Sequence, residues 1–295
     1  MTDRPEEGTV SWAELLAETT ARLKRAGIES AEIDARRIVE ETSGVEPSEF
    51  YEVLPALATM RGVATLDAMV ARREQGEPLQ YVVGRWGFRH LDLIVDKRVL
   101  IPRPETEEVA GLAIDEIKAR SVERELLVAD LGTGSGAIGL SIATECRSAR
   151  VLATDVSAEA LQVARANLTG IGRAASRVSL HEGSWFDALP ASVQGSLDVL
   201  VSNPPYVTDT EELPAVVADW EPSTALRAGG DGLDDLIAIV DGAVAWVAPG
   251  GVVILEMAPT QTATIAERFS TQGWSASVHI DLQGRDRAVV AHRPR

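Results

Sequence analysis

The chain of 295 residues contains a single cysteine, Cys146, and only four histidines. One cysteine excludes an internal disulfide bond, and the four histidines do not show the spacing of metal ligands. We therefore predict no metal centre. A reducing compartment, the cytoplasm, fits this cysteine usage best.

Long apolar runs are also missing. The longest uncharged apolar stretches, 131–144 and 242–255, contain glycines and fall short of the ~18 residues that a transmembrane helix needs. The first ten residues are acidic and lack the apolar segment of a secretory signal. We expect neither secretion nor association with a membrane.

Basic residues are scarce. The chain has 28 lysines and arginines against 45 aspartates and glutamates, which gives a net charge of -17. Such a charge repels phosphate backbones, so it disfavours an extended contact with nucleic acid. Residues before Ile101 include 13 basic and 18 acidic side chains, and the acidic excess is larger after it, so no direct nucleic-acid binding is expected from either half.

Apolar residues make up 45% of the chain, and their spacing divides it into three parts. Residues 11–75 show helical periodicity, which predicts a small N-terminal helical domain over 1–77. Residues 78–103 contain the alternating Leu91, Leu93 and Val95, followed by a turn before Val99–Ile101, and this pattern predicts a β-hairpin linker. The remainder, 104–295, alternates strands with helices.

This alternation predicts an α/β domain with a doubly wound, mostly parallel, Rossmann-like sheet. Only a short loop separates the last two strands, so they should form an antiparallel hairpin. Seven strands are expected, at 126–129, 150–153, 177–180, 197–201, 251–255, 275–280 and 288–291.

The first of these strands runs into a glycine-rich loop, 132–136. Glycines let the backbone turn sharply and approach a ligand, and the N–H groups of the following helix point at it. The loop alone is ambiguous, because Gly132, Gly134 and Ala137 with Asp155 about 20 residues on also fit the dinucleotide-binding fingerprint. We predict a ligand that carries a nucleoside.

Two carboxylates lie at the predicted ligand edge of the sheet. Asp155 ends the second strand, where it would accept hydrogen bonds from both ribose hydroxyls; it would serve equally well as the N-cap of the helix that begins near Ser157. Asp130 ends the first strand. Acidic residues on both strand ends suit a cationic cofactor better than a pyrophosphate.

The tetrapeptide Asn203-Pro204-Pro205-Tyr206 follows the fourth strand. The two prolines hold the Asn203 amide and the Pro204 carbonyl stiffly at the sheet edge. One N–H of a planar amide or base amine would then donate to the Asn203 side-chain oxygen, and the other would donate to the Pro204 carbonyl. Tyr206 would lie against the planar group and exclude water. We therefore predict that this tetrapeptide is the catalytic element.

The glycine loop, Asp155 and this tetrapeptide resemble the amino-methyltransferases that use S-adenosyl-L-methionine. The segments 76–84, 85–88 and 99–107 resemble the linker of the HemK family, the peptide chain release factor glutamine methyltransferases. Downstream, 229–233 and 284–287 also fit, whereas Ala258 departs from the glycine usual in that family. The resemblance extends from about residue 30 to the end of the chain.

This resemblance implies a class I methyltransferase domain, and an enzyme that methylates the glutamine of the Gly-Gly-Gln motif in class I release factors. Asp155 would hold the ribose, Trp185 would lie beside the adenine or merely pack in the core, and Asn203 would contact both cofactor and substrate. Arg103 and Thr106 would lie where the linker meets the pocket; the alternative role for Thr106 is that of a helix N-cap. A monomer is expected. The loop expected to hold the methionine part consists of Gly132, Thr133, Gly134, Ser135 and Gly136.

Three other functions are weighed against this one. An adenine methyltransferase would use the same tetrapeptide on a flipped base, but residues 206–241 contain nine acidic side chains and only Arg227 as a basic one. The activity of an NAD-dependent oxidoreductase would not explain why this tetrapeptide follows the fourth strand. A non-catalytic sensor or scaffold is disfavoured because both the loop and the tetrapeptide are intact.

Overall fold

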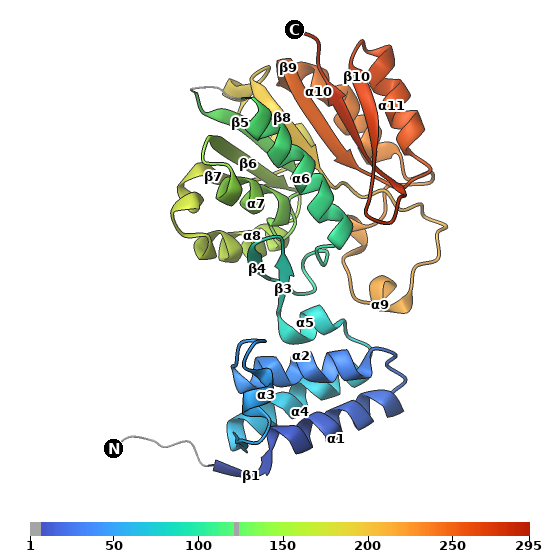
Figure 1. Ribbon diagram of the computed structural model, residues 1–295. Helices are drawn as coiled ribbons and strands as arrows, with labels where there is room; N and C mark the ends of the chain where they lie inside the picture. The colour runs from blue at the N-terminus through green and yellow to red at the C-terminus, as the bar shows by residue number, and fades with distance from the viewer. Residues whose placement is uncertain (1–6, 121–123) are drawn as a thin grey trace. The chain divides into compact units, whose positions relative to one another are not determined.

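The computed structural model describes residues 7–120 and 124–295, so the first six residues of the predicted N-terminal domain lie outside it. The chain forms two compact units (Figure 1). The helical unit consists of the chain up to Gly84 and Ala215–Trp220, and the sheet unit consists of Arg85–Pro214 and Glu221–Arg295. Over the described ranges, no helix has both the length and the apolar character needed to cross a bilayer. The predicted boundaries at 77 and 103 stay predictions.

The helical unit is built on three mutually packed helices, α1, α2 and α4. Ser11 and Glu14 form a capping box that fixes the start of α1. The apolar stripes of the three helices meet in a core that includes the fully buried Leu23, Ile38 and Val70. The elements of this unit are β1 (Glu7–Ser11), α1 (Trp12–Arg25), α2 (Ala31–Ser43), α3 (Phe50–Val53), β2 (Leu57–Thr59), α4 (Met60–Glu74), α5 (Leu79–Val83) and α9 (Ala215–Ala218).

A buried ion pair joins α2 to α4 in this unit. The Arg73 Nε donates to Asp34 Oδ2 at 2.7 Å, and the two side chains are only 12% and 4% exposed. Arg73→Met leaves a buried carboxylate without its partner, so we expect the free energy of unfolding to fall by about 3 kcal/mol. Chemical denaturation measures this. Lys24→Met, which breaks an ion pair exposed on the same unit, should change it by less than about 0.5 kcal/mol; equal losses would contradict the prediction.

The sheet unit contains a seven-stranded sheet in the order β10-β11-β9-β8-β5-β6-β7. Its strands are parallel except for β11, which runs antiparallel to both β9 and β10. The seven predicted strands and the final hairpin are confirmed. The strands are β5 (Leu126–Leu131), β6 (Ala149–Asp155), β7 (Val178–Glu182), β8 (Leu197–Ser202), β9 (Val247–Glu256), β10 (Ser275–Ile280) and β11 (Asp286–His292).

Helices cover both faces of this sheet (Figure 1), as predicted for a doubly wound α/β fold. Helices α6 and α7 pack together on one face, and α10 and α11 pack together against β9, β10 and β11. Central strands buried on both sides read as continuous apolar runs, and all six residues of β8 are buried. The helices are α6 (Pro104–Ala119), α7 (Ala137–Glu145), α8 (Ala158–Gly170), α10 (Asp234–Trp246) and α11 (Thr262–Thr271), with short 3-10 turns η1 (Gly172–Arg177), η2 (Trp185–Ala188), η3 (Ala191–Val193) and η4 (Ser223–Ala225).

The linker does contain a β-hairpin, but the predicted pairing was wrong. Strands β3 (Arg85–Phe88) and β4 (Leu91–Ile94) pair with each other, and 99–101 forms no strand. The turn lies at Arg89, whose φ of 51° is unusual for a residue with a side chain. Its guanidinium binds Glu145 with two hydrogen bonds of 2.6 and 2.9 Å. Arg89 and Glu145 are 56 residues apart in the sequence, so the local alternation of apolar residues did not reveal the turn.

Candidate active site

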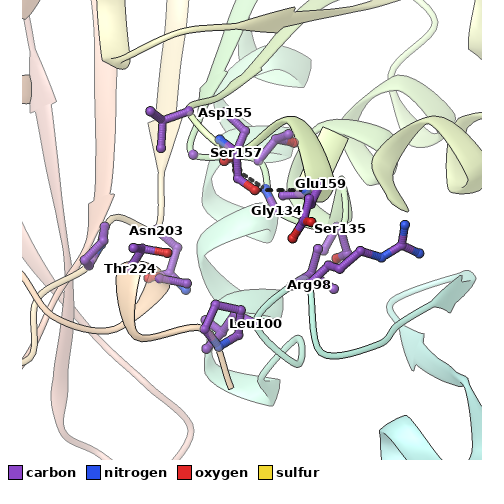
Figure 2. A pocket seen from close by; sticks show the side chains of 18 of the residues that line it. Arg98, Leu100, Gly134, Ser135, Asp155, Ser157, Glu159, Asn203 and Thr224 are labelled. Carbon is purple, nitrogen blue, oxygen red and sulfur yellow. Dashed lines mark hydrogen bonds between the residues drawn. The ribbon is translucent and has the colours of Figure 1, made fainter. Parts of the chain in front are cut away.

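A cavity of about 360 Å³ lies at the carboxyl edge of the sheet, and all its walls belong to the sheet unit. Its volume falls in the range of small-molecule sites. The glycine loop after β5, the end of β6 and the residues after β8 meet here because the carboxyl ends of parallel strands share one edge. In Figure 2, Asn203 and Thr224 lie on one side of the cavity, and Ser135 and Arg98 lie on the other.

The glycine loop takes the strained path that its sequence predicts. Gly132, Gly134 and Gly136 all have positive φ, between 56° and 87°. A Cβ added at Gly134 would meet no atom within 4 Å, so this glycine is required by its backbone conformation and leaves open space beside the loop. The N–H of Thr133 donates to the carbonyl of Thr154 at 2.8 Å, which ties the loop to β6.

Asp130 lies behind the loop. Its Oδ2 accepts hydrogen bonds from the Thr133 hydroxyl at 2.5 Å and from the Gly139 N–H at 2.9 Å, whereas its buried Oδ1 has no partner among the described residues. Burial raises the pKa of Asp130 to about 6. The carboxylate therefore braces the loop and the first turn of α7, and its second oxygen provides negative potential behind the cavity.

Asp155 lines the cavity at the end of β6. Its Oδ2 accepts from the Gly134 N–H and its Oδ1 from the Ser157 N–H, both at 2.8 Å (Figure 2). The helix N-cap is Ser157, whose hydroxyl accepts from the Ala160 N–H, so the N-cap alternative for Asp155 is wrong. Burial raises the pKa of Asp155. A third backbone N–H, that of Val156, also donates to the carboxylate, which keeps acceptor capacity for a hydroxyl of a ligand.

Trp185 lines the cavity beside the glycine loop. A Cβ on Gly132 would lie 3.4 Å from the Trp185 ring, so glycine allows the indole to approach the loop backbone. Its backbone has a φ of 43°, and its side chain hydrogen-bonds to Asp235 on α10. The ring also packs against the apolar core of the sheet unit. The indole thus packs in the core and also presents a surface to a ligand.

The Asn203-Pro204-Pro205-Tyr206 tetrapeptide begins where β8 ends. Asn203 and Pro205 line the cavity, and the Asn203 Nδ2 donates to the Thr106 hydroxyl at 3.2 Å. The amide oxygen of Asn203 therefore remains the free end of that side chain. The Tyr206 hydroxyl donates to Glu256 Oε1 at 3.5 Å, and burial raises its pKa above the usual value. Tyr206, which is not among the residues that line the cavity, is thus held through its hydroxyl.

Two residues behind this tetrapeptide were not assigned their observed roles by sequence reasoning. Arg103 and Thr106 both line the cavity, as the resemblance predicted. The N-cap alternative for Thr106 is wrong, because the N-cap of α6 is Arg103 and Thr106 lies in the first turn with its hydroxyl toward Asn203. Glu256, the last residue of β9, is 1% exposed and hydrogen-bonds with Thr106 and Tyr206. A carboxylate at the end of a buried strand is the signal that was available in the sequence.

Burial raises the pKa of Glu256 to about 7, from an ordinary value of 4.5. The unfolded chain therefore loses this proton at lower pH than the folded protein, and stability is lost as pH rises from about 4.5 to about 7. The difference corresponds to about 3 kcal/mol at full ionisation. We expect Glu256→Gln to gain that much stability relative to wild type between pH 4.5 and 8. Urea unfolding at both pH values measures it; a pH-independent difference would contradict it.

The sheet order, the glycine loop and the cavity at the carboxyl edge define a class I methyltransferase fold. Two family descriptions match the chain, "PrmC N-terminal domain" over residues 14–84 and "Methyltransferase small domain" over 112–231. A solved methyltransferase from Pyrococcus furiosus is 20% identical, with a TM-score of 0.50, over 70% of this chain and 91% of that one. This likeness concerns the fold alone.

Curated relatives define the family more closely. A release factor glutamine methyltransferase of Streptomyces coelicolor is 40% identical over 94% of this chain and 96% of its own length. Another of the same name, from Deinococcus radiodurans, is 39% identical over 95% and 98%. The chain belongs to the family of release factor glutamine methyltransferases, and it is an enzyme of the methyltransferase class.

Proposed function

We propose that this protein methylates the side-chain amide nitrogen of the glutamine in the Gly-Gly-Gln motif of class I peptide chain release factors, and so modulates translation termination. Family membership supports the substrate class. The observation that carries the chemistry is Asn203: its nitrogen is engaged by Thr106, and its oxygen is left for an N–H group at the cavity wall.

S-adenosyl-L-methionine is the proposed cofactor, and the residues present fit it. The open space beside Gly134 and the lone pairs of Asp155 suit a chain passing the loop and a ribose, and Trp185 offers a flat surface for adenine. The carboxylates of Asp130 and Asp155 suit its positive charges. When bound, the cofactor would supply an electrophilic methyl group: its sulfur–methyl bond would break to leave a neutral thioether, and the amide nitrogen would gain the methyl and release one proton to solvent.

The role of the chain's own residues is to hold the substrate amide. One N–H would donate to Asn203 Oδ1 and the other to the Pro204 carbonyl, so the nitrogen faces the cavity. Orientation of this kind supplies up to ~7–11 kcal/mol of a barrier. Both acceptors also stabilise the positive charge that develops on the nitrogen. Pro205 and Tyr206 fix the acceptors and shield them from water.

The charge of the chain disfavours the adenine alternative. Residues 206–241, which begin within the tetrapeptide, contain nine acidic side chains and one basic side chain. We therefore propose a protein substrate and no direct nucleic-acid partner. A monomeric, cytoplasmic enzyme with an N-terminal recognition domain over 1–77, a linker over 78–103 and a catalytic domain over 104–295 completes the proposal.

Methyl transfer to a purified class I release factor tests the proposal. Labelled S-adenosyl-L-methionine is supplied with the wild-type factor, with a variant in which the Gly-Gly-Gln glutamine is alanine, and with bulk DNA and RNA. We expect label on the wild-type factor alone. Label on nucleic acid would favour the adenine alternative, and no label anywhere with cofactor bound would favour a sensor.

A further inference from the structure

Glu256 is a buried acid for which the proposed chemistry has no use so far. It is 1% exposed, and its Oε2 has no hydrogen-bond partner among the described residues. A buried carboxylate with an unpartnered oxygen lowers the stability of the fold, so its presence calls for a functional explanation. Its place at the carboxyl end of β9 puts it beside the element that follows β8, since the two strands pair in parallel.

Four groups face this carboxylate. The Tyr206 hydroxyl donates to its Oε1 at 3.5 Å, the Thr106 hydroxyl lowers its pKa as a hydrogen-bond donor, and the charges of Arg287 and Glu105 act on it with opposite signs. Arg287 is partly engaged elsewhere, because its Nη2 lies 3.5 Å from Asp281 Oδ2. The direct partners of Glu256 are therefore two hydroxyls. That of Tyr206 lies in the tetrapeptide, and that of Thr106 contacts Asn203.

The hydrogen-bond directions along this chain of groups are determined by what each group can donate. A threonine hydroxyl has one hydrogen. Thr106 accepts from Asn203 Nδ2, so its own hydrogen is free to go to another acceptor, and Glu256 is the acceptor placed to receive it. With this direction fixed, the Asn203 amide has its nitrogen toward Thr106 and its oxygen toward the cavity. A reversed amide would present N–H groups to a substrate that also donates.

We propose that Glu256 is a positioning residue that acts through Thr106 to hold the Asn203 amide in the orientation that accepts a substrate N–H. This inference rests on the proposed function and names residues beyond the tetrapeptide that determine its specificity for an amide NH2. Glu256 also receives the Tyr206 hydroxyl, so the same carboxylate fixes both ends of the tetrapeptide.

Steady-state kinetics of four variants test the connection. Thr106→Val and Glu256→Leu remove the hydroxyl and the acceptor with little change in volume, and we expect each to lower kcat about 30-fold with an unchanged KM for the cofactor. Thr106→Ser and Glu256→Gln keep the bonding groups and should stay within about 3-fold of wild type. Asp198→Asn, a buried acid at the amino end of β8, is the matched control and should leave kcat unchanged.

The double variant separates positioning from general damage. Because Thr106 and Glu256 act through one chain of bonds, the double variant Thr106→Val/Glu256→Leu should have a kcat no lower than that of either single variant. Adding either substitution to Asn203→Ala should not lower the kcat of that variant further. Losses that multiply, or single variants with normal kcat, would overturn the inference. Glu256→Leu substitutes an apolar side chain for a buried acid, so it should fold; Thr106→Val stands independently if it does not.

A second readout does not depend on turnover. Carboxyl ¹³C NMR, assigned by difference with Glu256→Gln, follows the titration of Glu256, whose midpoint we expect at about 7. The Thr106 bond lowers this pKa, so Thr106→Val should raise the midpoint, whereas Asp198→Asn should not move it. An unmoved midpoint in Thr106→Val overturns the contact. If wild type methylated no release factor, the proposed function would fail while this titration still decided whether Thr106 and Glu256 are connected.

Discussion

Asn203→Ala should lower kcat for methyl transfer about 10³-fold and leave the affinity for S-adenosyl-L-methionine within about 3-fold of wild type. The alanine variant loses the acceptor that holds one substrate N–H and stabilises the charge on the nitrogen, and removal of one such group typically costs 10²–10³ in kcat. The cofactor keeps its contacts with the glycine loop and Asp155. Single-turnover kinetics and isothermal titration calorimetry measure the two quantities.

The matched control is Gln194→Ala, which removes an exposed amide side chain from the same unit, outside the cavity wall. It should change neither quantity. Asn203→Asp keeps an oxygen but loses the nitrogen that donates to Thr106, so we expect an intermediate kcat. Equal losses of turnover and cofactor affinity in Asn203→Ala would assign Asn203 to cofactor binding and refute its role in orienting the substrate.

The strands, and with them the edge that carries the site, were predictable because they are apolar runs at regular intervals. Parallel strands buried on both faces have this signature, and glycines with positive φ such as Gly134 mark the turn after the first of them. The linker hairpin was misplaced because its turn depends on Arg89, whose partner Glu145 is distant in the sequence. Periodicity carries no information about such a contact.

The candidate site, too, was predictable from the sequence only in part. Asp155 and Asn203 follow predicted strands, so topology alone brings them to one edge of the sheet. Thr106 and Glu256 belong to a helix start and to another strand end, and their connection to Asn203 appears only when side chains are placed. Spacing in the sequence indicates which strand ends meet, whereas the direction of each hydrogen bond requires the folded geometry.

The second large effect is expected at Asp155. Asp155→Ala should weaken binding of S-adenosyl-L-methionine about 10³-fold, because two charge-assisted hydrogen bonds to the ribose, worth about 2 kcal/mol each, are lost. The variant also frees the Gly134 N–H, which the carboxylate holds at 2.8 Å in the loop. Burial raises the pKa of Asp155, so wild-type affinity should begin to fall, as pH decreases, at a higher pH than an exposed aspartate would cause.

Glu182→Ala provides the comparison, because Glu182 ends β7 as Asp155 ends β6, the two residues pair in register, and Glu182 is exposed. It should bind the cofactor as wild type does, which separates a specific contact from the loss of one negative charge at this sheet edge. Calorimetry at low and moderate salt measures both variants. If Glu182→Ala lost as much affinity as Asp155→Ala, the general field of the acidic edge would explain binding, since screened charges act over about 10 Å at 0.1 M salt. A loss confined to Asp155 and insensitive to salt requires the direct contact, and places the ribose beside the glycine loop.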